Sequence, residues 1–196
     1  MVTPDLLRLR EDFQVAVQLR PVLPIAVRMK EALFTGDHRR AQYILIDAKR
    51  RAEFLGMTIG MPSPDPIVQD FATFEVAEHQ PFIYHLTKLG AEAARRGKGV
   101  ELAYQISHLI WGGEPAWNEG DKLAAAVARA GLALADLEAA IATYDPMTDI
   151  EANHAALEAA GGWGVPTMVF NGEPFFGQDR IDTLRWRLEK LGVPKR

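Results

Sequence analysis

The last part of the chain constrains its fold more than any other segment. Val165–Phe170 is a run of β-type residues, and the Asn171-Gly172 pair that follows is a strong hairpin signal, because both central residues of such a turn need positive φ. Glu173–Phe176 predicts the return strand. Ile181–Leu191 places apolar residues at helical spacing. The pattern therefore predicts a strand, a tight turn, a second strand and a closing helix.

The beginning of the chain also combines a predicted helix with a predicted strand. Leu6–Phe13 has an apolar side and a charged side, which favours a helix, and the β-branched run Val15–Leu19 favours a strand. The next segment, Val22–Val27, is apolar but interrupted by Pro24. Because proline cannot donate to a ladder, we expect an extended core-lining segment or a pocket wall there.

Helical patterns dominate the middle of the chain, and glycines separate them. A proline-rich passage, 61–66, follows the first of these patterns and excludes regular structure locally. The expected helices are 39–55, 82–96, 102–111, 117–130, 134–143 and 148–160. A helical block inserted into a small α/β domain explains this order better than two consecutive domains. The predicted division is 1–34 with 148–196 for the α/β domain, and 35–147 for the helical domain.

Composition excludes several classes of chemistry. The sequence contains no cysteine, so it cannot form a disulfide, a thiol nucleophile or a zinc–thiolate site. The net charge of −4 argues against nucleic acid as a partner. No apolar run is long enough to span a membrane, which together with the absence of a signal-like start predicts a cytoplasmic protein. The five histidines show no metal-ligand spacing, so we expect no metal site.

One long motif carries a family resemblance. Gly164-Val165-Pro166-Thr167-Met168-Val169-Phe170-Asn171-Gly172-Glu173-Pro174-Phe175-Phe176-Gly177-Gln178-Asp179-Arg180 resembles the closing motif of the 2-hydroxychromene-2-carboxylate isomerase family. That family belongs to the thioredoxin-like superfamily, beside the kappa-class glutathione transferases and the DsbA-type oxidoreductases. The resemblance implies a thioredoxin-like α/β domain with a large all-helical insertion.

Weaker matches extend the resemblance over the chain. Arg20-Pro21 follows a predicted strand as the family's Arg-Pro pair does, and Trp111 stands near the end of a helix as the family's tryptophan does. A spaced pattern on the first central helix also fits, comprising Arg40, Tyr43, Asp47, Arg50 and Ala52. For Tyr43, Asp47 and Arg50 we expect an internal support network rather than direct catalysis.

The resemblance implies that glutathione is the cofactor. The Val165-Pro166 pair resembles the family's cis-proline element, which presents main-chain groups to a thiol peptide as an added strand does. Gln178-Asp179 matches the pair that grips the γ-glutamyl end, although Gln178 or Asp179 also stands where an N-cap belongs. Trp163 is a candidate for lining the site or for the core.

Two further expectations concern the substrate pocket and the core. Pro24 and Arg28 follow the second predicted strand, where the family's substrate pocket lies. Arg28 would meet an acidic substrate there, although a solvated arginine is the plainer reading. Trp111 and Trp117 are expected in the core or between helices, with lining of the pocket as the lesser alternative.

The sequence departs from the family at its beginning. The family opens with a strand and a Ser-Pro-aromatic loop whose serine is catalytic, and no such element occurs before Leu6. Ser63-Pro64 lies in the proline-rich passage and does not match. The catalytic residue is therefore unassigned, and the sequence either lacks an upstream segment or belongs to a degenerate member.

Two functions follow from the resemblance. The first is a glutathione-dependent isomerase or transferase acting on small aromatic or conjugated carboxylic acids, in aromatic catabolism and as a homodimer. The alternative is a non-catalytic or truncated thioredoxin-like member that binds glutathione or a partner without turnover.

Overall fold

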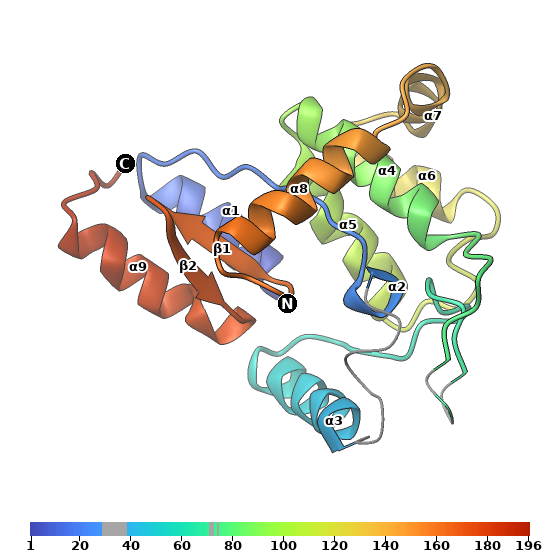
Figure 1. The fold of residues 1–196 in the computed structure, drawn as a ribbon, viewed down its shortest axis with the longest axis horizontal. Coiled ribbons are helices and arrows are strands. Elements are labelled where there is room, and N and C mark those ends of the chain that lie inside the picture. Colours follow the sequence, from blue (N-terminus) through green and yellow to red (C-terminus); the bar gives the residue numbers. More distant parts are fainter. Residues whose placement is uncertain (29–38, 71–72, 74) are drawn as a thin grey trace.

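A computed structural model describes residues 1–28, 39–70, 73 and 75–196. In these residues a hairpin and two flanking helices lie at one end, a group of helices lies at the other, and α8 runs between them (Figure 1). The helices are α1 (Thr3–Asp12), α2 (Ile25–Arg28), α3 (Arg39–Phe54), α4 (Ile83–Arg95), α5 (Gly99–Trp111), α6 (Lys122–Arg129), α7 (Leu134–Thr143), α8 (Met147–Ala159) and α9 (Ile181–Lys190), with strands β1 (Thr167–Phe170) and β2 (Glu173–Phe176) and a 3₁₀ turn, η1 (Gln178–Arg180).

The predicted hairpin is confirmed. β1 and β2 pair antiparallel, with Phe170 opposite Glu173 and Thr167 opposite Phe176. Asn171 and Gly172 form the turn with φ values of 51° and 81°. Both values lie in the region that such a two-residue turn requires, so the local chemistry of these two residues sets the register of the strands.

One core joins the two ends of the chain. Leu9 from α1 and Phe13, which follows this helix, pack with Met168 and Phe175 from the hairpin, and with Leu188 from α9. Val100 at the start of α5 belongs to the same cluster, so the helical block also reaches this core. The predicted domain boundary at 34/35 lies outside the described residues, and the division into two domains stays a prediction.

The expectation of a strand at Val15–Leu19 is wrong. The segment is extended, and its side chains alternate between half-buried and exposed as in a strand, but it belongs to no ladder in the described residues. The sequence pattern correctly reports the alternation, while a strand also needs a hydrogen-bonded neighbour. The only bridge beside it joins Phe13 to Lys195, among the residues that the structure describes.

The segment Val22–Val27 is core-lining but not extended throughout. Its second half forms the start of α2, where the carbonyl of Pro24 accepts hydrogen bonds from the amides of Val27 (2.9 Å) and Arg28 (3.1 Å). Leu23 and Val27 are buried in a cluster with Ile150 of α8. Proline is favourable just before or at the first turn of a helix, which explains why this segment turns rather than continuing extended.

The central helices follow the expected order, but two of them start elsewhere: α5 begins three residues early, at Gly99, and α6 begins late. The helix expected from residue 117 begins only at Lys122, and Trp117 lies in the preceding turn. Trp117 is 1% exposed, as expected for a core residue, and its indole donates to the Pro64 carbonyl at 2.7 Å. Trp111 is 41% exposed, so it does not lie in the core, and the alternatives of packing between helices or lining a pocket stay open.

A buried carboxylate within α4 pairs with two arginines at the C-terminal end of the same helix. Glu92 is 2% exposed and accepts hydrogen bonds from Arg95 (2.8 Å) and Arg96 (2.7 Å). Burial alone would raise the pKa of Glu92, but the hydrogen bonds and charges of the two arginines outweigh it and lower the pKa. Arg96 also donates to the Asp136 carbonyl, which ties α4 to α7.

We expect Phe13→Ala to destabilise the fold by about 3–5 kcal/mol, because Phe13 is fully buried in the core that joins the chain ends. Urea unfolding followed by circular dichroism measures the change. Phe54→Ala is the matched control, since Phe54 is 75% exposed, and its effect should stay within about 0.5 kcal/mol. Equal effects for the two variants would contradict this description of the core.

We expect Glu92→Gln to cost about 1–3 kcal/mol near neutral pH, because it removes the charge from two buried hydrogen bonds. The native pKa of Glu92 is lowered, so its contribution is present above the unfolded value of about 4.3 and is lost as the pH falls through the native pKa. Urea unfolding between neutral and acid pH should show a smaller acid loss in the variant. Glu119→Gln, which removes an exposed carboxylate that forms no ion pair with a described residue, should keep the acid loss of the parent protein.

Candidate functional site

The open end of the hairpin brings two segments of the predicted site together. The amide of Gly177 donates to the carbonyl of Pro166 at 2.9 Å, one step beyond the last ladder pair. Val165 precedes β1 and Gln178 follows β2, so this hydrogen bond holds both residues at the open end of the hairpin. The Val165–Pro166 peptide bond is cis, as the motif implies. Val165 is 61% exposed and its main-chain groups form no hydrogen bond with a described residue.

Two aromatic rings form a platform beside Val165. The ring centroids of Trp163 and Phe176 are 4.7 Å apart, with the rings tilted by 45°. Gly164 makes this approach possible, because a Cβ there would lie 2.9 Å from the Phe176 ring. Trp163 is 55% exposed, so the alternative that placed it in the core is wrong. Tilted aromatic pairs of this kind offer a broad surface to an apolar or conjugated ligand.

The next part of the site is the turn at the start of α9. Gly177 has φ 110°, and Gln178 and Asp179 then lie in the 3₁₀ turn η1. Neither caps α9, whose N-cap is Arg180 and carries no side-chain cap. The predicted N-cap is therefore wrong, because the extra turn moves the start of the helix past both side chains.

The two side chains of this turn differ in their surroundings. The Oε1 atom of Gln178 is buried and has no hydrogen-bond partner in the part of the chain that the structure describes. The carboxylate of Asp179 is 59% exposed and contacts only the Arg180 guanidinium among the described residues, at 3.4 Å. Buried side-chain acceptors are nearly always satisfied, so the unpartnered Oε1 marks a position where a ligand donor would fit.

Arg28 reaches the same surface from α2. Its Nε donates to the Leu23 carbonyl at 2.8 Å, and its Nη2 donates to the Trp163 carbonyl at 3.2 Å. The predicted substrate-pocket residue and the predicted cofactor residue are therefore neighbours in space. No described hydrogen bond joins Pro24 to Trp163. Pro24 contributes instead by starting the α2 turn, which carries Arg28.

Helix α8 holds the segment that supports Arg28, which the sequence alone did not indicate. His154 accepts a hydrogen bond from the Leu23 amide through Nε2 at 2.8 Å, and Asn153 donates to the Pro21 carbonyl at 2.9 Å. Partial burial and the positive charge of Arg28 lower the pKa of His154. The neutral ring is thus the form that accepts this bond.

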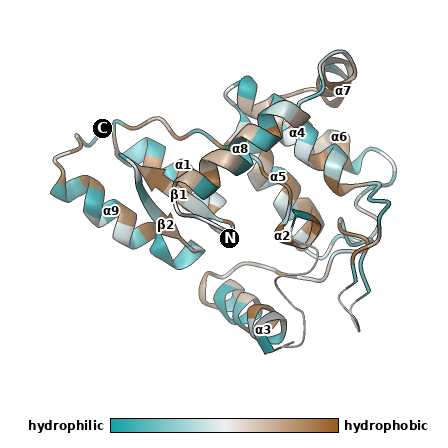
Figure 2. Ribbon diagram, in the orientation of Figure 1, coloured by the Kyte–Doolittle hydropathy of each residue, from teal (hydrophilic) through white to brown (hydrophobic). Residues whose placement is uncertain are grey.

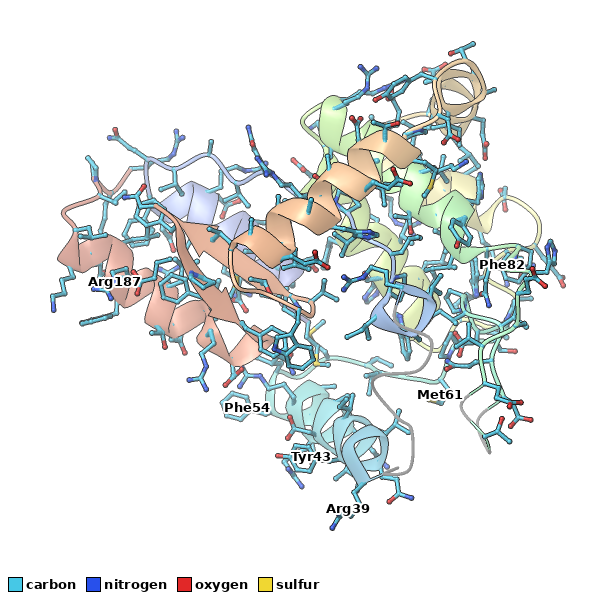
Figure 3. The ribbon with its side chains drawn as sticks, viewed as in Figure 1. Arg39, Tyr43, Phe54, Met61, Phe82 and Arg187 are labelled. Carbon is cyan, nitrogen blue, oxygen red and sulfur yellow. The ribbon has the colours of Figure 1, made fainter. Side chains whose placement is uncertain are left out.

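Helix α3 carries the weaker family pattern but builds little of this site. Asp47 and Arg50 form an ion pair at 3.1 Å, but the pair is solvent-exposed and lies within one helix, so the expected internal support network is wrong. Tyr43 is 60% exposed, and Figure 3 shows Tyr43 and Phe54 pointing away from α3 on the same side. Hydrophobic and hydrophilic residues are mixed along this helix (Figure 2). The side chain of Arg40 lies outside the described part of the chain.

The described residues show neither a metal-binding cluster nor a membrane-spanning helix. They contain no group of histidines and acidic residues arranged to hold a metal ion. Among the helices of this part of the chain, none combines the length and the apolar character that a bilayer crossing needs.

We expect Arg28→Gln to raise the pKa of His154 toward its usual value, because the substitution removes a nearby positive charge. An NMR titration of the imidazole measures the change. With the native pKa lowered, the contribution of the neutral ring is present above about 6.5 and is lost as the pH falls through the native value. Arg187→Gln, which lies beside Glu173 on the far side of the hairpin, should leave the titration unchanged. A His154 titration insensitive to Arg28→Gln would contradict this geometry.

Comparisons with known proteins identify the fold and the family of this chain. A solved selenomethionine structure of 2-hydroxychromene-2-carboxylate isomerase matches 85% of this chain and 75% of its own, with a TM-score of 0.55 and 15% sequence identity. At that identity the match shows the fold alone, which is the predicted thioredoxin-like α/β domain with a helical insertion. No curated protein matches the sequence. The sequence profile described as a DSBA-like thioredoxin domain matches residues 2–189. The chain therefore belongs to the DsbA-like thioredoxin domain family.

Proposed function

We propose that this protein binds glutathione at the open end of the hairpin and uses it to isomerise or transfer small aromatic or conjugated carboxylic acids. The observation that carries the proposal is the meeting of Trp163, Val165 and Gln178 on one surface. These residues come from separate sides of the hairpin, and the Gly177–Pro166 hydrogen bond holds them together. The solved isomerase that shares the fold supports the class of substrate.

The main chain of Val165 suits a peptide-like ligand. Its N–H and C=O have no hydrogen-bond partner among the described residues, and its side chain is largely exposed. An extended peptide can pair with such groups in the same way as an added strand. The cysteine residue of glutathione is the part of the tripeptide that would pair here, which places its thiol beside the Trp163 platform.

The turn η1 suits the other end of glutathione. The buried Oε1 of Gln178 would accept a hydrogen bond from the ligand, and the Asp179 carboxylate would face the γ-glutamyl ammonium. A hydrogen bond between two charged groups is about twice as strong as one between neutral groups. The residues present therefore fit the ligand that the motif implies.

The chemistry needs a thiol from outside the chain. The sequence has no cysteine, and bound glutathione would supply the thiolate nucleophile. Arg28 uses two of its five N–H donors on the Leu23 and Trp163 carbonyls, which leaves three that a substrate carboxylate can share. We therefore assign Arg28 to holding the acid group of the substrate next to the aromatic platform. A homodimer in the cytoplasm remains the prediction that accompanies this function.

We expect Asp179→Asn to weaken glutathione binding about tenfold, because it removes the charge that faces the ligand ammonium. Isothermal titration calorimetry with reduced glutathione measures the affinity. Asp182→Asn is the matched control, since Asp182 is an exposed carboxylate in the first turn of α9, outside η1. Equal losses of glutathione affinity in the two variants would show that Asp179 acts only through the net charge of the protein and not through a direct contact with the ligand.

The same preparation decides whether binding leads to turnover. Isomerisation of 2-hydroxychromene-2-carboxylate should require glutathione, and Arg28→Gln should raise KM for the acid more than it changes glutathione affinity. Glutathione binding without turnover selects the non-catalytic alternative. No binding of glutathione to the parent protein contradicts the proposed function and leaves only the form of the alternative that binds another partner.

A further inference from the structure

Two hydrogen bonds attach the segment that ends in Arg28 to α8 and the chain that follows it. The Leu23 amide donates to Nε2 of His154 in α8 at 2.8 Å, and Nη2 of Arg28 donates to the Trp163 carbonyl at 3.2 Å. Because Trp163 lies just after the end of α8, both acceptors belong to one continuous stretch of chain. The segment 23–28 is therefore held at its beginning by an imidazole and at its end by a main-chain carbonyl.

Leu23 connects these two attachments through its own main chain. Its amide is the group that His154 accepts from, and its carbonyl accepts from Nε of Arg28 at 2.8 Å. Its side chain is buried in a cluster with Ile150 of α8. A continuous series of hydrogen bonds thus runs from His154 through Leu23 to Arg28 and on to the Trp163 carbonyl. A change at the imidazole reaches the guanidinium through a single residue.

Only the neutral form of His154 can take part in this series. Its Nε2 atom accepts the hydrogen bond from Leu23, so the single ring proton of this state is on Nδ1. Protonation at Nε2 converts this acceptor into a donor and places its N–H against the Leu23 N–H. Two donors cannot form a hydrogen bond, so the contact is lost in the charged form.

The surroundings of the imidazole determine when this change occurs. Partial burial lowers the pKa of His154, and the positive charge of Arg28 on α2 lowers it further. Glu151 and Glu158, on either side of His154 along α8, act in the opposite direction with smaller effects. These are the charged groups of the described residues that act on the ring. The neutral ring therefore prevails at neutral pH, and the charged ring, which also repels Arg28, forms under acid conditions.

Other contacts keep the segment in place when this hydrogen bond is lost. Asn153 donates to the Pro21 carbonyl at 2.9 Å, and neither of these groups gains or loses a proton near neutral pH. The side chains of Leu23 and Val27 are buried. Protonation of His154 therefore alters the Leu23 peptide group and the guanidinium that depends on it, while the fold is preserved.

We propose that His154 is a positioning residue for Arg28, whose guanidinium is held at the Trp163 carbonyl by the neutral ring and released by the protonated ring. The arrangement is a pH-sensitive switch built from α8 and the segment before α2. Its effect on the binding of an acid substrate rests on the proposed function. The movement of Arg28 itself needs neither glutathione nor substrate, so the two proposals can fail separately.

Heteronuclear NMR of the unaltered full chain tests the link between the two side chains. The signals of the His154 imidazole, the Leu23 amide and the Arg28 Nε–H are followed between about pH 8 and about pH 5. We expect all three to change with one midpoint. The Leu23 amide should lose at least about tenfold of its hydrogen-exchange protection in the acid form, after correction for the intrinsic rate. Leu23 and Arg28 signals that do not follow the imidazole would overturn the proposal.

Two substitutions of His154 separate the hydrogen bond from the titration. The amide oxygen of glutamine can accept from the Leu23 amide at every pH, whereas leucine offers no acceptor. His154→Gln should keep the neutral-pH signal of Arg28 and abolish its pH dependence. His154→Leu should show the acid-form signal of Arg28 already at neutral pH. A pH dependence that persists in His154→Gln, or a neutral-form signal in His154→Leu, would contradict the proposal.

A second histidine provides the matched control. His85 in α4 pairs with Glu138 at 2.8 Å and has no described contact with the segment 23–28. His85→Gln should leave the midpoint and the size of the Arg28 change as in the parent protein. An Arg28 titration that disappears in His85→Gln would show that the switch is not at His154.

Kinetics provide a readout that a purely structural role of His154 would not move. In the parent protein, KM for the acid substrate should rise about threefold to tenfold as the pH falls through the His154 midpoint, with a smaller change in kcat. This rise should be absent in His154→Gln. A rise of the same size in His154→Gln would overturn the positioning role. A lack of turnover at every pH would contradict the proposed function alone, and the NMR titration would still decide whether His154 controls Arg28.

Discussion

The hydrogen bond from the Gly177 amide to the Pro166 carbonyl is the contact on which the proposed site depends. It extends the hairpin past its last ladder pair, so the residues before β1 and after β2 meet at one edge. The register that produces this meeting is set at the opposite end by the Asn171-Gly172 turn. Met168 and Phe175 then fix the hairpin against α1 and α9. A local turn signal and a shared core together position the surface where Trp163 and Val165 lie.

The parts of the fold that the sequence predicted are those whose causes are local. The Asn171-Gly172 turn and the period of the helices depend on nearby residues, and they are confirmed. Val15–Leu19 shows strand alternation, but a ladder needs a second strand, which no local pattern reports. The cap of α9 was missed because the positive φ of Gly177 leads into an extra 3₁₀ turn.

In the candidate site, too, the sequence predicts only what depends on neighbouring residues. The motif indicated Val165 and Gln178 together, and the structure brings them to one edge beside Trp163. The link from Arg28 to the Trp163 carbonyl joins residues far apart in sequence, and nothing local predicts it. The same holds for His154, whose role in holding Leu23 is a property of how α8 packs. Phe176 was read as a strand residue, yet its ring is half of the aromatic platform.

The sequence has no cysteine, so the proposed chemistry needs a thiol from a ligand, and the central claim is the proposal that the open end of the hairpin binds glutathione. A titration of the ¹⁵N-labelled protein with reduced glutathione, followed by heteronuclear NMR, tests this claim most directly. The account predicts the largest shifts at the Val165 and Gln178 amides and at the Trp163 indole, with Val100 at the start of α5 unchanged. Shifts centred on another surface, or no shifts at saturating glutathione, would contradict it.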